Sequence, residues 1–240
     1  MLKYRRALLK ISGEVLLGEG LSVVDPLVVK SFCEEVKEVL SLGAELAIVV
    51  GGGNILRGVS VEKQGIDRVK ADQAGMLATL INCLLLEDLF SKSGIPAKVL
   101  SAYEIKGVVE AFSKDRALKY LKEGKVLFLA CGTGNPFFST DTAGVLRALE
   151  ISADVFLKAT KVDGVYDKDP AKDPSAKKYE RITYEEALLK GLKVMDLTAF
   201  SLAKENNLPV VVFKFPEKGA LRAALIGEPI GTYIGKSISQ

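Results

Sequence analysis

The chain has 240 residues, 48% of them hydrophobic, and its 33 Lys and Arg against 30 Asp and Glu give a formal net charge of +3. This length suits one large domain or two closely joined ones, and basic residues interleaved with acidic ones do not favour nucleic-acid binding. Histidine is absent, which excludes a Ser-His-Asp triad, a His–Cys dyad, a His general base and any His metal ligand.

The first fifty residues predict a strand, a helix and a strand. A short apolar run over 5–11 indicates the first strand, and the stretch 44–50, which ends in four apolar residues, indicates a buried second one. The helix between them spans 25–43. It begins at the capping Asp25, has Pro26 in its first turn and ends at a glycine.

The same alternation continues to the C-terminus. Helices are predicted over 72–90, 113–124, 142–151, 183–191 and 196–207, and strands over 95–100, 125–131, 153–159, 208–213 and 232–235. The helix over 72–90 is so apolar that much of it must be covered, and a second subunit is one candidate cover. The helix over 183–191 opens with a capping box from Thr183 to Glu186. The strand over 232–235 is a candidate edge strand.

Strands alternating with helices predict an α/β fold. We expect a three-layer sandwich in which a central, mainly parallel sheet is covered by helices on both faces. Ligands of such sheets lie beyond the carboxyl ends of the strands, so the loops after residues 11, 50, 131 and 158 are the candidate site. The polar segment 166–182 is predicted to be an ordered excursion between the sheet halves, and the best boundary if the chain has two lobes.

Cysteine usage and the lack of targeting signals indicate the compartment. Cys33, Cys83 and Cys131 are far apart and odd in number, which is typical of reduced thiols in a cytosolic protein. Cys33 and Cys83 are predicted to be buried apolar side chains. The N-terminus lacks the long apolar region of a signal peptide, and no apolar run approaches the ~20 residues that span a bilayer. These features predict a cytoplasmic protein without membrane contact.

Two glycine-containing loops follow the first two strands. Lys10 ends the first strand, and the small residues Ser12 and Gly13 let backbone N–H groups face a phosphate, although a strand-end lysine that reaches solvent explains Lys10 equally well. After the second strand, three glycines at 51–53 let the backbone approach an anion at a helix N-terminus, and Arg57 can reach the same anion. The glycine spacing matches neither a P-loop nor a dinucleotide-binding motif.

The loop after residue 131 reads "CGTGNPFFSTDTAG". Asn135-Pro136 gives a rigid turn, and Phe137 and Phe138 offer flat apolar surface. One of the residues Ser139 to Thr142 caps the helix that follows. Amides and hydroxyls beside two aromatic rings suit a flat base with a polar edge.

The fourth loop, 158–170, carries charge and one aromatic ring. Lys158 and Lys161 could each face a phosphate, Tyr166 could stack on a base, and Asp169 could accept hydrogen bonds from a ribose or an amine. A solvated loop explains the same residues equally well.

Together the four loops resemble the bacterial uridylate kinases (UMP kinases), a family within the amino acid kinase superfamily. The resemblance runs nearly end to end and rests on the strings "LLKISGE", "VVGGGNILRG", "DQAGMLATLIN", "GTGNPFFSTDTAGVLRALEI", "LKATKVDGVYDKDPAKDP" and "KVMDLTAF". The fourth and fifth strings are diagnostic of the family. The first two indicate only the superfamily, which includes kinases that act on carboxylates and carbamate.

The resemblance implies a reaction and an assembly. The reaction is transfer of the γ-phosphoryl group of ATP to UMP, with Mg²⁺, in pyrimidine nucleotide biosynthesis. Residues 1–240 would form a single domain, with an N-terminal lobe over about 1–150 for UMP and a C-terminal lobe over about 151–240 for ATP, assembled as a homohexamer. No residue is assigned to the metal, because Mg²⁺ is expected to bind mainly through the phosphates.

The resemblance also implies site residues. It assigns UMP to Gly52, Asp72, Thr133, Gly134, Asn135, Pro136, Phe137, Phe138, Ser139 and Thr140, with Asp72 taking the ribose hydroxyls. It assigns ATP to Lys10, Ile11, Ser12, Gly13, Gly53, Arg57, Thr160, Tyr166 and Asp169, the last three at its adenosine end. The catalytic residues would be Lys10, Arg57, Asp141 and Asp196. The acceptor is already an anionic nucleophile, so no general base is needed. Lys10 and Arg57 would offset repulsion between the phosphates, and we expect the two aspartates to hold the lysine and metal network in place.

One departure and two alternatives remain. The stretch after "KISGE" reads "VLLGEGLSVVD" and lacks the family's more usual aromatic-glycine pattern, which argues against activation by GTP and leaves inhibition by UTP open. One alternative is a superfamily kinase for a carboxylate or carbamate, which needs no aromatic loop. The other is a non-catalytic nucleotide- or oxyanion-binding protein, against which the presence of Lys10, Asp141 and Asp196 argues.

Overall fold

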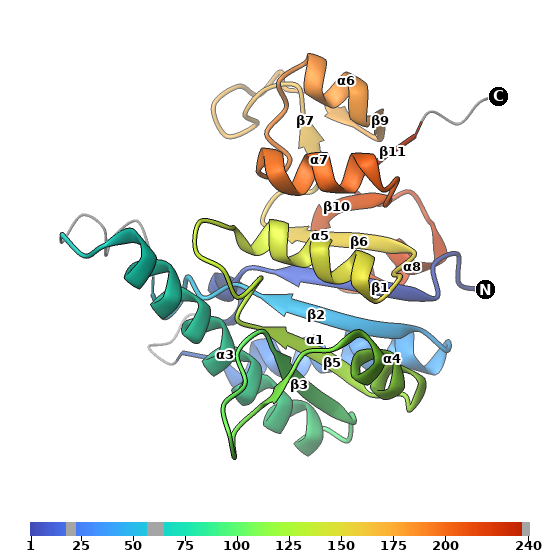
Figure 1. Ribbon diagram of the computed structural model, residues 1–240. Coiled ribbons are helices and arrows are strands. Elements are labelled where there is room, and N and C mark those ends of the chain that lie inside the picture. Colours follow the sequence, from blue (N-terminus) through green and yellow to red (C-terminus); the bar gives the residue numbers. More distant parts are fainter. Residues whose placement is uncertain (18–22, 57–64, 237–240) are drawn as a thin grey trace.

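The computed structural model describes residues 1–17, 23–56 and 65–236 (Figure 1). Arg57 therefore lies outside the described residues, and so do positions 18–22 of the stretch on which the prediction about GTP depends.

A nine-stranded sheet forms the centre of the described structure. Its strands are β1 (Arg6–Ile11), β2 (Glu45–Val50), β3 (Ala97–Ser101), β4 (Glu110–Ala111), β5 (Val126–Ala130), β6 (Val155–Thr160), β9 (Arg181–Thr183), β10 (Val210–Lys214) and β11 (Thr232–Gly235). They lie in the order β4-β3-β5-β2-β1-β6-β10-β11-β9. From β4 to β10 every neighbouring pair is parallel, whereas β11 is antiparallel to β10. The sheet is therefore mainly parallel, as predicted.

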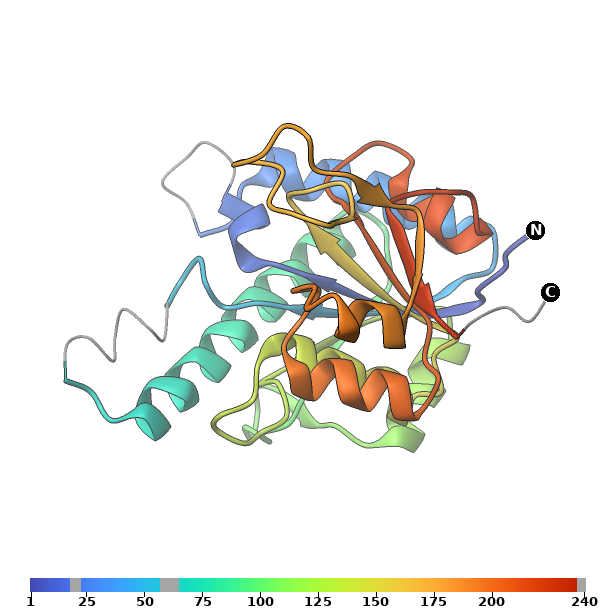
Figure 2. The same cartoon turned by 90° about the horizontal axis from the view of Figure 1, so that it is seen from above.

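Helices cover both faces of the sheet and complete the three layers (Figure 2). One face carries α1 (Pro26–Ser41), α3 (Arg68–Lys92) and α8 (Ala220–Ile226), and the other carries α4 (Lys114–Lys122), α5 (Thr140–Glu150), α6 (Tyr184–Leu189) and α7 (Leu197–Glu205). Each face has its own cluster of buried apolar side chains. Alternate residues of a strand enter different clusters, because successive side chains point to opposite faces. Leu9 of β1, for example, packs toward α1 and α3, while Leu8 packs toward α5.

The residues predicted to cap two of the helices do so in the structure. Asp25 accepts a hydrogen bond from the Leu27 amide and Pro26 occupies the first turn of α1. Thr183 and Glu186 form the reciprocal capping box of α6. The three cysteines are buried and unpaired, which confirms the prediction for Cys33 and Cys83.

Two predictions about the C-terminal half are wrong. The strand over 232–235 is not at the edge, because β11 pairs with β10 on one side and with β9 on the other. The segment 166–182 does not lie between two halves of a sheet. It contains the hairpin of β7 (Val165–Tyr166) and β8 (Lys178–Tyr179) and leads into β9 at the sheet edge. These strands are two or three residues long and mostly polar, so they lack the apolar pattern that marks the central strands.

Helix α3 is longer and more exposed than the sequence indicates. It begins at Arg68 after the capping Asp67. By length and composition it is the one helix of the described residues that could cross a membrane, but 39% of its most apolar window is buried against the rest of the protein. Phe90, Leu86 and Cys83 of α3 pack in the core. This side of α3 is therefore that of a core helix. Its outer side is open, with Leu77, Ile81 and Leu85 exposed at helical spacing.

Candidate active site

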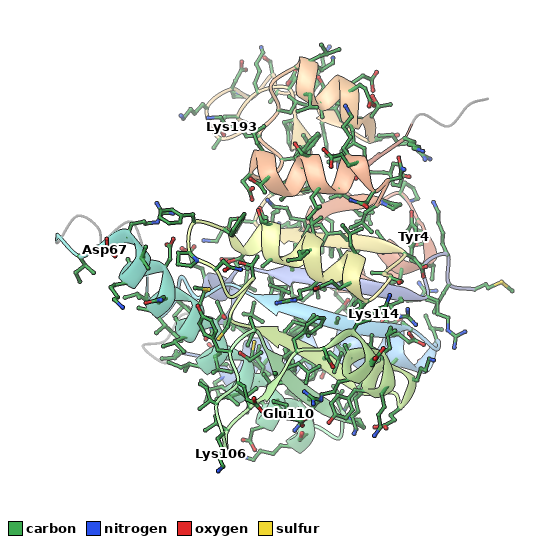
Figure 3. All side chains as sticks on the ribbon, in the orientation of Figure 1. Tyr4, Asp67, Lys106, Glu110, Lys114 and Lys193 are labelled. Atoms are coloured by element: carbon green, nitrogen blue, oxygen red, sulfur yellow. The ribbon has the colours of Figure 1, made fainter. Side chains whose placement is uncertain are left out.

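The four candidate loops come from four neighbouring strands. They follow β5, β2, β1 and β6, which are adjacent in this order in the sheet and parallel to one another. All four loops therefore lie at the same edge of the sheet. Figure 3 shows Asp67, the cap of α3, and Lys193 on the side where these strands end, and Tyr4 on the opposite side.

Strand pairing brings two lysines together at this edge. Lys10 of β1 lies directly opposite Lys158 of β6 in the parallel register. Leu8 and Phe156, two residues earlier on each strand, belong to the cluster on the α5 face, so both lysines project toward α5. A Cβ at Gly144 of α5 would lie 2.6 Å from the Phe156 ring. The glycine therefore lets α5 approach the sheet closely enough to reach the lysines.

Asp141, in the first turn of α5, binds both lysines. Its Oδ1 lies 3.0 Å from Lys10 Nζ, and its Oδ2 lies 2.5 Å from Lys158 Nζ. Lys158 also donates to the carbonyl of Val194 at 2.6 Å. The three charged side chains are only 13–16% exposed. The Lys10–Asp141–Lys158 cluster therefore fixes both ammonium groups at the carboxyl end of the sheet.

The cluster carries one more positive than negative charge. Burial opposes ionisation of Asp141, but the attraction of Lys10 and Lys158 and their hydrogen bonds outweigh it, so the pKa of Asp141 lies below its ordinary value. Burial lowers the pKa of Lys158, and the attraction of Asp141 only partly offsets this effect. Asp141 can neutralise one lysine and not two. The cluster is therefore suited to an additional anion such as a phosphate.

Asp196 has a different position from Asp141. It caps α7, where its Oδ1 accepts hydrogen bonds from the Ala199 amide at 3.0 Å and from Thr142 Oγ1 at 2.9 Å. Its Oδ2 accepts from the hydroxyl of Ser139, the cap of α5. These contacts join the N-termini of α5 and α7. Asp196 thus supports the helix that carries Asp141, and its negative charge also attracts Lys158.

A cavity of about 500 Å³ opens beside this cluster. Its walls include most of the residues that the resemblance assigns to UMP: Gly52, Asp72, Thr133, Asn135, Phe137, Phe138, Ser139 and Thr140. Gly134 and Pro136 are not among the lining residues, and Gly53, which the resemblance assigns to ATP, is one of them. Thr140 lines the cavity, and Asp141 is the next residue. The cavity volume falls in the range of small-molecule sites.

Asp72 is already paired in this cavity. It accepts hydrogen bonds from the Phe137 amide at 2.7 Å and from Arg68 Nε at 2.9 and 3.0 Å. The Arg68 guanidinium also lies 5.7 Å from the centre of the Phe137 ring. Phe137 has a φ of +71°, a strained value for a residue with a side chain. The sequence analysis missed Arg68, although its spacing of four from Asp72 is the signal of a helical ion pair.

Buried groups hold the loop after β5 in shape. Thr79 of α3 accepts a hydrogen bond from the Cys131 amide at 2.9 Å. Arg147 donates to the Gly132 carbonyl at 3.2 Å, and the hydroxyl of Tyr103 donates to the Gly134 carbonyl at 3.0 Å. The sequence gives no local signal for these supports, because each partner lies on another element.

The residues assigned to the adenosine of ATP do not line the cavity. Thr160 donates to the Val162 carbonyl at 2.5 Å, and the Tyr166 hydroxyl donates to Asp163 at 2.6 Å. Asp169 is exposed and accepts a hydrogen bond from the Ala171 amide at 3.0 Å. Thr160 also donates to the Phe213 carbonyl at 3.4 Å, so the polar groups of all three residues are paired within the protein.

The remaining residues assigned to ATP lie near the cluster. Ile11 is buried at the end of β1, and Ser12 Oγ accepts a hydrogen bond from the Glu14 amide at 3.3 Å. Of the two lysines left open by the sequence, Lys158 belongs to the Lys10–Asp141–Lys158 cluster, while Lys161 is exposed and pairs with Glu14 at 3.0 Å. Gly13 is packed among the neighbouring loops.

The described residues contain no group of three His, Cys, Asp or Glu that could hold a metal ion. The carboxylate of Asp141 is committed to two lysines. That Mg²⁺ binds mainly through phosphate oxygens, as the resemblance implies, stays a prediction.

The chain matches a family profile, named relatives and solved structures. The profile of the Amino acid kinase family matches residues 5–214. A relative named Uridylate kinase from Porphyromonas gingivalis is 49% identical, and the match covers 99% of this chain and 99% of the relative. Another protein of that name, from Xanthomonas euvesicatoria pv. vesicatoria, is also 49% identical, and the match covers 97% of each chain. The crystal structure of a UMP kinase from Bacillus anthracis superposes with a TM-score of 0.93 at 37% identity, covering 98% of this chain and 97% of that one.

Proposed function

The chain belongs to the amino acid kinase family, and within it to the uridylate kinases, and we propose on this premise that it transfers the γ-phosphoryl group of ATP to UMP. The enzyme is a nucleoside monophosphate kinase. The observation that carries the substrate assignment is the 500 Å³ cavity, walled by the loop with Phe137 and Phe138 and adjoining the Lys10–Asp141–Lys158 cluster.

The chemistry requires positioning and charge neutralisation rather than a base. The phosphate of UMP is an anionic nucleophile, and it attacks the γ-phosphorus of ATP as the bond to the leaving β-phosphate oxygen breaks. Lys10 and Lys158 offset the repulsion between the two nucleotides and the charge on the transferred group. Asp141 holds both ammonium groups at the reacting phosphates. No protein carboxylate is assigned to Mg²⁺; the ion would be held mainly through the phosphates and would neutralise part of their charge.

The two nucleotides occupy different parts of the site. UMP binds in the cavity, on the side formed by residues 1–150, with its ribose on Asp72 and its uracil in the loop Thr133–Thr140. ATP binds along residues 151–240, where Thr160, Tyr166 and Asp169 take its adenosine end, while Lys10 to Gly13 and Gly53 face its phosphates. Arg57 is assigned to the phosphates by the resemblance alone.

The family also supports a cellular setting. We infer a cytoplasmic enzyme of pyrimidine nucleotide biosynthesis that functions as a homohexamer. The exposed side chains of Leu77, Ile81 and Leu85 on α3 support association, because a surface stripe of this kind is commonly covered by a partner. Activation by GTP is not expected, and inhibition by UTP is left to experiment.

A substrate panel tests the proposal. The purified protein with ATP and Mg²⁺ is assayed against UMP, CMP, AMP, GMP, glutamate, aspartate and carbamate, with and without GTP and UTP. We expect UMP to be the preferred acceptor. Phosphorylation of a carboxylate or carbamate, with UMP unchanged, would establish the alternative kinase. Binding of UMP and ATP without turnover would identify a non-catalytic nucleotide-binding protein.

A further inference from the structure

A pair of asparagine side chains lies beneath the glycine loops. Asn82, on the mainly apolar inner side of α3, is fully buried. Its Nδ2 donates to Asn54 Oδ1 at 2.8 Å, and Asn54 Nδ2 donates back to Asn82 Oδ1 at 2.9 Å. We call these two residues the amide pair. A buried polar side chain is costly unless its hydrogen bonds are made, and here they are made reciprocally.

The amide pair also ties three backbone segments together. The second hydrogen of Asn82 Nδ2 reaches the Gly51 carbonyl at 2.8 Å, and the second hydrogen of Asn54 Nδ2 reaches the Val23 carbonyl at 2.9 Å. Each amide thus uses both of its N–H groups. Rotating either amide by half a turn would place oxygen against a carbonyl, so the orientation of both side chains is fixed.

The loops after β1 and β2 interlock at the amide pair. A Cβ at Gly13 would lie 2.2 Å from Asn54 Oδ1 and 2.3 Å from the Gly51 carbonyl oxygen. The Gly51 amide donates to the Ile11 carbonyl at 3.0 Å. Contacts this close leave no freedom for one loop to move without the other.

The triglycine loop, Gly51–Gly53, rests directly on α3. A Cβ at Gly52 would lie 2.9 Å from the Gly75 carbonyl oxygen and 3.0 Å from Ala78 Cβ. Asn82, one turn after Ala78, anchors the preceding residue of the loop through the Gly51 carbonyl. The backbone of this loop therefore takes its position from α3, by contact at Gly52 and by hydrogen bond at Gly51.

We propose that Asn54 and Asn82 are positioning residues that hold the loop at Gly13 and the triglycine loop in one fixed relation, so that both nucleotides meet amides already in place for their phosphates. This inference rests on the proposed function, in which Gly13 faces ATP, Gly52 faces UMP and Gly53 faces ATP from the cavity wall. Neither asparagine needs to touch a substrate. Because one pair supports both loops, a defect in it affects both nucleotides together.

The substitution Asn82→Asp tests the pair with almost no change in shape. It replaces two donors by an oxygen that faces Gly51 O and Asn54 Oδ1, which pushes the triglycine loop away. We expect kcat/KM to fall about 10²-fold, the loss that a displacement near 1 Å causes at a reacting centre. The affinities for UMP and ATP should fall, while those for uridine and adenosine stay unchanged in calorimetry, because only the phosphates rest on the loops.

Two further variants keep the test decisive if Asn82→Asp folds poorly. Asn54→Ala removes the pair from the less buried side without introducing charge, and the double variant Asn54→Ala/Asn82→Ala should lose less than the sum of the two single alanine variants. Cys83→Ala is the matched control. This neighbouring residue is buried on the same helix, so its truncation should lower the unfolding temperature and leave kcat/KM unchanged.

The binding comparison separates this inference from the proposed function. If the wild-type protein bound both nucleotides without phosphorylating UMP, the proposed function would fail, yet the comparison of nucleotide with nucleoside would still report on the loops. Equal losses for nucleoside and nucleotide in Asn54→Ala would overturn the inference. So would a loss confined to one of the two nucleotides, or strict additivity in the double variant.

Discussion

The two sides of the candidate site differ in how complete they are without a ligand. On the acceptor side, residues from α3, the triglycine loop and the loop after β5 converge on one cavity of about 500 Å³. On the donor side, Tyr166 and Asp169 are paired with their own neighbours, Thr160 bonds the carbonyls of Val162 and Phe213, and none of the three lines that cavity.

Support from the sheet and helices explains this difference. The acceptor side is held in place by α3, by the buried side chains of Thr79 and Arg147 and by the half-buried Tyr103. Tyr166 and Asp169, which are assigned to the donor, belong to a short hairpin that is tied to the sheet through Thr232 of β11, while the Tyr166 hydroxyl itself bonds only its neighbour Asp163 among the described residues. On the proposed assignment, acceptor binding would depend on a preformed wall, whereas donor binding would exchange hydrogen bonds within the protein for bonds to the nucleotide. The Lys10–Asp141–Lys158 cluster should act on the phosphates of both nucleotides.

The largest effect should come from the cluster. Lys158→Met keeps the length of the side chain and removes its charge, so the transferred phosphoryl group loses one of its two fixed cations. We expect kcat to fall about 10³-fold with both KM values little changed, measured by steady-state kinetics. Lys161→Met is the control, because that exposed lysine pairs with Glu14 outside the cluster. Equal losses in the two variants would show that Lys158 has no special role.

Asp141→Asn should have the next largest effect. It leaves both lysines without their shared carboxylate, so the ammonium groups separate and the reacting phosphates lose their alignment. A fall in kcat of about 10²-fold, with the affinity for UMP retained in calorimetry, is the expected outcome. A variant that kept the wild-type kcat would refute the role assigned to this aspartate.

Asp72→Asn tests the acceptor side by itself. The amide can replace only part of the charged hydrogen bonding to the ribose, so the KM for UMP should rise about tenfold, with the KM for ATP unchanged. Asp88→Asn on the same helix removes an exposed pair with Lys92 and should change neither constant. A rise in the KM for ATP in Asp72→Asn would mean that the two sides are not separate.

Tyr166→Phe tests the donor side and should have the smallest effect. The lost hydroxyl bonds Asp163 in the free protein, so its removal costs little before ATP binds. We expect the KM for ATP to rise only about threefold, the size of one neutral hydrogen bond, and the KM for UMP to stay constant in the same assay. A tenfold effect would show the donor side to be as preformed as the acceptor side.

The four loops could be predicted from the sequence because local patterns decide which strands and helices form. Apolar strands followed by glycine loops predicted the four loops, and the parallel sheet brought them to one edge. The partners within the site depend on register between distant strands. Lys158 joins Lys10 only because β6 pairs with β1 at that register, and a one-residue shift would turn one lysine to the opposite face.

The same limit explains the errors at the other end of the chain. The interior position of β11 depends on β9, a three-residue strand with too little pattern to predict. The role expected for Asp196, to hold the lysine network in place, stays a prediction; what the sequence did not show is that its hydrogen bonds join α5 to α7 through Ser139 and Thr142. Its distance along the chain from α5 left no local sign of this connection.

A crystal structure with UMP and a non-hydrolysable ATP analogue tests the central claim most directly. The account predicts that the uridine lies in the cavity beside Asp72, with the acceptor phosphate on the triglycine loop and the terminal phosphate of the analogue in contact with Lys10 and Lys158. Both nucleotides bound with neither phosphate near these lysines would contradict it.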